Sequence, residues 1–204
     1  MEDYLKPTKF CNCNHQEIIE KAKELTRNDK TPKEAALNIF YFVRDQIPFK
    51  TGNVVKASVT LKIRHGFCVT KSNLQVALLR AINIPARYHV AYLSKDVLKG
   101  VVPGIESDNI HDIITYHPWC ECYLSKKWIS CDTLFEKALI ETIFKEGIHS
   151  KEDIPIIDWD GESDLNTMTA WMIEDKGTYD SLDDLFLRVK NYFASGMIGL
   201  PPTP

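Results

Sequence analysis

The segment from residue 66 to residue 93 constrains the fold of this chain most strongly. Apolar residues recur at helical spacing over residues 67–82, where one face carries Leu74, Ala77, Leu78 and Ala81. Ile84-Pro85 ends this helix, and residues 86–93 alternate in polarity and are rich in aromatic side chains, which predicts a strand. A buried helix and a strand therefore follow one another directly.

Two more strands are predicted downstream, over residues 113–124 and 128–132, joined by the turn Ser125-Lys126-Lys127. Pro118 lies inside the first of them. Because proline cannot donate a ladder hydrogen bond, Pro118 indicates an edge position or a bulge.

Helices are predicted on both sides of these strands. Upstream, residues 15–26 have helical spacing, and Thr31, Pro32 and Glu34 form a start signal for a helix that ends before Pro48. Further helices are predicted over three downstream segments, residues 134–145, 164–175 and 181–194.

The segments between these elements are predicted to be irregular. Residues 49–65 lack a clear period and indicate a long loop, residues 94–110 a loop or lid with at most one helical turn, and residues 155–161 a short strand or loop. This order of elements predicts an α+β fold in one domain, residues 1–204. We divide it into three parts: an N-terminal helical segment 1–30, a core 31–135 and a mostly helical C-terminal extension 136–204.

Composition excludes several classes of protein. The 204 residues are 44% hydrophobic and 26% charged, as in globular domains. The net charge of −3 argues against a nucleic-acid binder, and no apolar run approaches the roughly 20 residues of a membrane helix. The N-terminus lacks the apolar core of a signal peptide, so we expect a soluble cytoplasmic protein without a membrane or nucleic-acid partner. Its oligomeric state is not readable from the sequence.

The charge is distributed unevenly along the chain. Residues 56–99 hold 8 basic residues and one acidic residue, whereas residues 152–184 hold 11 acidic residues and one basic residue. Two solvated faces of opposite sign would explain this pattern. Alternatively, the basic stretch sets the electrostatic potential around a reactive group that it contains.

Six cysteines occur, at positions 11, 13, 68, 120, 122 and 131. No CxxC pair is present, and without a secretory signal a disulfide framework is not expected. A metal site made of Cys120, Cys122, Cys131 and one N-terminal cysteine is an alternative, but the spacing does not favour it. We therefore expect no metal and no cofactor. Cys11 and Cys13 are expected at the surface.

Cys68 differs from the other five cysteines. It begins the helix 67–82 directly after Gly66-Phe67, where unpaired backbone N–H groups and the helix dipole stabilise a thiolate. The basic residues Arg64, His65 and Lys71 nearby would act in the same direction. A buried structural cysteine is the alternative interpretation.

His117 and Asp132 provide partners for such a thiol. A hairpin of this length can bring His117, on the first strand, close to Asp132 at the end of the second. His117 shares its strand face with Trp119, Glu121 and Tyr123, whereas Cys120 and Cys122 point to the opposite face. Cysteine, histidine and aspartate together make a nucleophile, a base and an orienting carboxylate.

These residues also carry a family resemblance. Gly66-Phe67-Cys68, LLRAINIPAR (78–87), HPWCECYL (117–124) and WISCD (128–132) stand in the order typical of the transglutaminase-like superfamily. The match covers roughly residues 31–135 and resembles small stand-alone bacterial and archaeal members. Asn83 stands where the family has glycine, and a lysine, Lys71, lies close to the nucleophile.

The resemblance implies a papain-like core, with the nucleophile at a helix N-terminus packed on an antiparallel sheet. It further implies a thioester formed by Cys68, with His117 as base and Asp132 as orienting group, acting on an amide- or glutamine-containing small molecule, peptide or protein. Hydrolysis and transfer to an amine both fit, so protease activity is included. Gln46 is one candidate for a second oxyanion donor. The alternative is a non-catalytic module that binds a peptide or partner. An arylamine N-acetyltransferase is not favoured, because the RGGxC signature of that family is absent. A papain-like protease is not favoured either, because those enzymes use asparagine rather than aspartate as the third residue.

Overall fold

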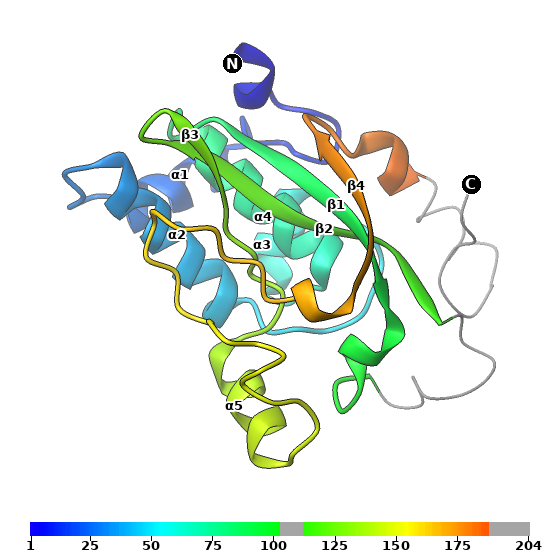
Figure 1. The fold of residues 1–204 in the computed structure, drawn as a ribbon. Coiled ribbons are helices and arrows are strands. Elements are labelled where there is room, and N and C mark those ends of the chain that lie inside the picture. Colours follow the sequence, from blue (N-terminus) through cyan, green and yellow to red (C-terminus); the bar gives the residue numbers. More distant parts are fainter. Residues whose placement is uncertain (103–111, 188–204) are drawn as a thin grey trace.

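A four-stranded antiparallel sheet forms the centre of the computed structural model, which describes residues 1–102 and 112–187. The strand order is β3-β2-β1-β4. The strands are β1 (Ala86–Ser94), β2 (Ile113–Leu124), β3 (Lys127–Ser130) and β4 (Met172–Tyr179). Figure 1 shows helices α1 to α4 gathered on one face of this sheet, with α5 set apart at one end. The predicted α+β fold class is confirmed.

Helix α4 (Cys68–Ala81) is the central helix and packs against β1 and β2. All residues from Val69 to Arg80 are buried. At its start the Thr70 hydroxyl accepts a hydrogen bond from the Phe67 N–H at 3.0 Å. At its end Asn83 adopts a left-handed conformation with φ 63°, which asparagine tolerates better than most residues other than glycine. The asparagine therefore fits the turn that leads into β1.

The other helices of this layer are α1 (Gln16–Leu25), α2 (Pro32–Gln46) and α3 (Ala57–Ile63). Thr31 caps α2 as predicted, because its hydroxyl accepts from the Glu34 N–H at 3.1 Å. The Glu34 carboxylate accepts from the Lys30 N–H rather than from that of Thr31. The prediction of a long loop over residues 49–65 was wrong, because this segment contains α3. Seven residues are too few for a helical period to be visible in the sequence.

The C-terminal part was predicted only in part. Helix α5 (Lys137–Lys145) confirms the helix expected there, but the helix expected over residues 164–175 was wrong. A short 3-10 helix η3 (Thr169–Trp171) and strand β4 occupy this stretch, and β4 pairs with β1. The extension is thus less helical than expected. Residues 183–187 are helical, and the rest of the helix expected over residues 181–194 lies outside the described residues.

The segment expected to be a loop or lid, residues 94–110, is described only to residue 102. It contains the 3-10 helix η2 (Lys95–Leu98), which agrees with the single helical turn expected there. Residues 155–161 contain neither a helix nor a strand. Pro118 lies in β2, an inner strand of the sheet, but β3 pairs only with residues 121–124, so β2 has a neighbour on one side only at Pro118. The register between β1 and β2 also shifts just before it, between the pairs Ala91–His117 and Leu93–Ile114. The expected edge position or bulge is therefore confirmed locally.

Buried apolar residues form two clusters, one on each face of the sheet. The larger cluster lies between the sheet and the helices and includes Cys120, Cys122 and Cys131. The smaller cluster includes Trp119. Cys68 packs against both clusters, which places it where the two meet. None of the helices among the described residues is long and apolar enough to cross a membrane.

All six cysteines are free thiols. Cys120, Cys122 and Cys131 point away from His117, as the strand alternation predicted. Cys11 and Cys13 are buried, so their expected surface position was wrong. Both belong to the larger apolar cluster, between the sheet and the helices. Within residues 1–102 and 112–187, no three side chains of histidine, cysteine, aspartate or glutamate form a group that could hold a metal ion.

The acidic residues of the C-terminal part are more than a solvated face. Asp158 pairs with Arg44 at 2.9 Å and with Lys137 at 3.0 Å. The Asp183 carboxylate accepts hydrogen bonds from the Thr8 hydroxyl and from the Lys9 N–H. These contacts attach Asp158 to α2 and α5, and Asp183 to the segment before α1.

Candidate active site

Cys68 is the first residue of α4 and is half-buried, whereas the other five cysteines are buried. Gly66 positions the turn before it. The Gly66 N–H donates to the Pro48 carbonyl at 3.1 Å, and its carbonyl accepts from the Lys50 N–H at 2.7 Å. A Cβ at Gly66 would lie 2.4 Å from the Thr70 hydroxyl oxygen, so this close approach requires glycine. The thiol is therefore held at the N-terminal end of the helix dipole.

His117 of β2 and Asp132 just after β3 lie together, as the hairpin predicted. Their Nε2 and Oδ2 atoms are 3.5 Å apart, and each side chain is 2% exposed. This separation is longer than a well-formed hydrogen bond, and Nε2 has no other hydrogen-bond partner. The contact is thus electrostatic in this structure.

The Asp132 carboxylate is fixed by two hydrogen bonds. Its Oδ1 atom accepts from the Leu134 N–H at 3.0 Å, and its Oδ2 atom accepts from the Thr167 hydroxyl at 3.0 Å. The Asp132 N–H in turn donates to the Leu165 carbonyl at 3.0 Å. Thr167 was not predicted from the sequence, and it carries no motif that could have identified it.

Gln75 of α4 supports the same loop from below. Its Nε2 atom donates to the Cys131 carbonyl at 3.0 Å, and its Oε1 atom accepts from the Thr133 hydroxyl at 3.0 Å. The helix that begins with Cys68 thus also fixes the residues on either side of Asp132. Gln75 was not predicted either, because only the fold brings it close to Cys131 and Thr133, which lie 56 and 58 positions later in the sequence.

The charge of His117 depends on its neighbours. Burial disfavours the charged ring, but the interactions with the Asp132 carboxylate and the Cys68 thiol outweigh burial and raise the pKa of His117 to about 9. The ring is therefore protonated near neutral pH. A charged imidazolium beside a cysteine is the arrangement of a thiolate–imidazolium pair.

Two other carboxylates could have oriented His117 but do not. Asp112 is 89% exposed and pairs with Lys95 at 2.9 Å. Glu121 pairs with Arg87 at 2.6 Å and with His89 at 2.8 Å. Asp132 is therefore the carboxylate that contacts His117.

Comparison with known proteins identifies the family of this chain. A family model described as the transglutaminase-like superfamily matches residues 19–133, more than half of the chain. The chain belongs to the transglutaminase-like superfamily. No curated protein matches the chain.

Solved structures similar to this superfamily member include the "putative cysteine protease" of Cytophaga hutchinsonii. It has a TM-score of 0.56 and 17% sequence identity over 89% of this chain and 47% of that chain. This chain thus spans about half the length of the Cytophaga protein. Red sea bream transglutaminase has a TM-score of 0.39 and 16% identity over 59% of this chain and 25% of that chain. The papain-like α+β core expected for the superfamily is confirmed.

The three basic residues near Cys68 in the sequence each contact a group other than its thiol. The Arg64 guanidinium lies 5.3 Å from the centre of the Phe42 ring, and the His65 ring contacts the Ile63 carbonyl at 3.0 Å. Lys71 is fully buried, and its Nζ atom donates to the Arg44 carbonyl at 3.2 Å. Gln46, the candidate oxyanion donor, is exposed at the end of α2.

Lys71 is held in an acidic environment. Burial lowers its pKa to about 8, although Glu136, Asp132 and Asp45 favour its charged form. The Lys71 ammonium therefore interacts electrostatically with these carboxylates, one of which is Asp132, rather than with the Cys68 thiol.

This lowered pKa gives a testable pH dependence. Because the folded pKa is below the unfolded value, the unfolded chain binds more protons between about pH 8 and pH 10.5, and Lys71 makes the folded state gain stability as pH rises there. Replacing Lys71 by methionine should remove this gain, on the order of 1–3 kcal/mol. Urea unfolding of both chains across this pH range measures it. A constant difference between the two chains would contradict the lowered pKa.

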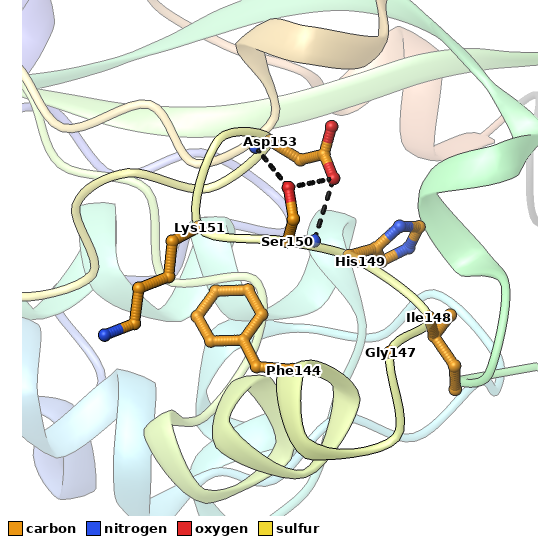
Figure 2. Close-up of a pocket in the computed structure, with 7 residues that line it drawn as sticks. All are labelled: Phe144, Gly147, Ile148, His149, Ser150, Lys151 and Asp153. Carbon is orange, nitrogen blue, oxygen red and sulfur yellow. Dashed lines mark hydrogen bonds between the residues drawn. The ribbon is translucent and has the colours of Figure 1, made fainter.

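A pocket of about 470 Å³ lies at the C-terminal end of α5, away from Cys68, His117 and Asp132, none of which lines it. Figure 2 shows the Asp153 carboxylate bonded to the N–H and hydroxyl of Ser150, while Lys151 points away from His149. The side chains that line this pocket do not converge on one point, so we assign no chemistry to it.

Proposed function

We propose that this chain is a cysteine enzyme that transfers the acyl group of an amide substrate through a thioester on Cys68. The Cys68 thiolate attacks the carboxamide carbon, and a carbon–sulfur bond forms. His117 donates its proton to the departing amine as the carbon–nitrogen bond breaks. Asp132 orients the imidazole ring and stabilises its charge.

The resolving step regenerates the enzyme. Water or a primary amine attacks the thioester carbon, His117 accepts the proton of the attacking group, and the carbon–sulfur bond breaks, which restores the Cys68 thiolate beside the protonated His117. Water would make the chain an amidase or peptidase, and an amine would make it a transamidating enzyme. The first oxyanion donor in this proposal is the backbone N–H of Cys68, at the positive end of α4.

One observation carries the proposal: His117 lies between a half-buried cysteine at a helix start and a fixed carboxylate. A structural cysteine would not need a neighbouring histidine held by an aspartate. The proposed substrate class, a glutamine side chain or a peptide bond, comes from the superfamily.

Incubation with a glutamine-containing peptide library, with and without a primary amine, tests the proposal. Mass spectrometry should detect peptides with ammonia replaced by water or by the amine, or peptides that have been cleaved. The Cys68→Ala chain is the matched control and should leave every mass unchanged. Equal product from both chains, or peptide capture without any change of mass, would support a non-catalytic binding module instead.

A further inference from the structure

His89 lies between two carboxylates on the sheet face opposite α4. Its Nδ1 atom is 2.8 Å from Glu121 Oε1, and its Nε2 atom is 2.7 Å from Asp175 Oδ1. An ionised carboxylate only accepts hydrogen bonds, so both ring nitrogens must carry a proton. His89 of β1 is thus an imidazolium that connects three strands, because Glu121 belongs to β2 and Asp175 to β4.

The same ring stacks on Trp119. The two ring centres are 4.3 Å apart and their planes differ by 11°. Trp119 is 3% exposed, and its indole N–H donates to the Ser130 hydroxyl at 3.1 Å. A cation over an indole face is the strongest of the cation–π arrangements. The plane of Trp119 is therefore fixed by a charged ring and by a hydrogen bond.

Trp119 in turn contacts the candidate base. The rings of Trp119 and His117 are stacked, with centres 5.9 Å apart and an angle of 27° between their planes. Because His117 is attached to Asp132 only by the 3.5 Å contact, Trp119 is a major restraint on the orientation of its ring. A continuous stack leads from His89 through Trp119 to His117.

We propose that His89 is a positioning residue that keeps His117 aligned for proton transfer, by holding Trp119 with a charged ring clamped between Glu121 and Asp175. This inference rests on the proposed function, because alignment of His117 matters only if it is paired with Cys68. His89 itself contacts neither the nucleophile nor the base.

The charges around His89 favour its protonated form. Burial disfavours the charged ring, but Glu121 and Asp175 outweigh burial and raise its pKa above the usual 6.5. Arg87 binds the second oxygen of Glu121 at 2.6 Å, and the Gly177 N–H binds Asp175 at 2.7 Å. The doubly bonded, charged ring therefore persists to higher pH than that of an ordinary histidine and is lost as the pH rises through the raised pKa of His89.

The test measures the rate at which iodoacetamide alkylates Cys68 in the 204-residue chain, followed by mass mapping of all six cysteines. Near about pH 6 a thiolate requires the imidazolium partner, whereas near about pH 10 any accessible thiol is ionised. We compare the parent with His89→Gln, which loses the charge and the stack, and with His89→Arg. Arginine is planar and charged and can both stack on Trp119 and bind two carboxylates. His15→Asn is the matched control, because His15 caps α1 far from this cluster.

We expect His89→Gln to slow alkylation about tenfold near pH 6 and to leave it unchanged near pH 10, while His89→Arg stays within about twofold of the parent. Parent-like rates for His89→Gln at both pH values would overturn the inference, as would equal slowing by both variants. A parent Cys68 that behaves like an ordinary thiol at every pH would overturn the proposed function and this inference together. If His89→Gln does not fold, Asp175→Asn replaces it, because this variant keeps the His89 ring and its stack on Trp119 but removes one of the two carboxylate charges. The inference then requires that Asp175→Asn slow the alkylation of Cys68 near pH 6, by less than about tenfold.

Discussion

Replacing Cys68 or His117 by alanine is expected to reduce product formation to the background rate. In the proposed mechanism both side chains take part in bond making: the thiolate forms the thioester, and the imidazole carries the proton to the leaving amine. Asp132→Ala removes only orientation and charge stabilisation, so activity should fall by about one to three orders of magnitude and not vanish. Rates are measured on the amide that the peptide screen identifies.

Cys13→Ala is the control for these variants, since Cys13 is also buried but lies before α1, away from His117. It should retain parental activity. If Asp132→Ala also retained parental activity, another group would have to orient His117. The structure leaves no ready replacement, because Glu121 is bound to Arg87 and His89.

Replacing Arg80 by methionine is expected to lower the free energy of unfolding by about 3–5 kcal/mol. Arg80 is 3% exposed, and its guanidinium donates four hydrogen bonds to backbone carbonyls. Two go to Ala86 at the start of β1, one to Lys6 and one to Asp180. Methionine fills similar space but leaves three carbonyl groups without their donor, and buried carbonyls without donors are costly.

Urea denaturation measures this change. Arg27→Met is the matched control, because Arg27 is exposed and its loss should change stability by less than about 0.5 kcal/mol. Arg80→Lys should lose nearly as much as Arg80→Met, since an ammonium cannot reach carbonyls on three separate segments. A loss below about 1 kcal/mol for Arg80→Met would show that these carbonyls find other partners.

The sequence predicted the elements whose period is long enough to be seen. Helix α4 spans four turns, and β1 and β2 are long strands, so their patterns are clear. Helix α3 is only seven residues long, and β4 is a mostly exposed edge strand without clear alternation. The position of β4 is decided by pairing with β1, whose residues come 79 to 91 positions earlier, and no local pattern records this pairing.

The same distinction applies to the candidate site. Cys68, His117 and Asp132 could be predicted because a helix start and a tight hairpin are local features. Gln75 and Thr167 could not, since they reach the Asp132 loop from remote parts of the chain. Lys71 shows a further limit: sequence proximity suggested a partner for the thiol, whereas the direction of a helical side chain sends it toward Arg44.

The contacts of Leu165 and Thr167 with Asp132 determine how far the chain could be truncated from its C-terminal side without disturbing the candidate site. The superfamily match ends at residue 133, yet both residues that hold Asp132 from the C-terminal side come more than thirty positions later. A fragment ending at the family boundary would keep Cys68, His117 and Asp132 but lose the hydroxyl and the carbonyl that fix the aspartate. The family match therefore ends before the residues that fix Asp132 in this structure, which extend to Thr167.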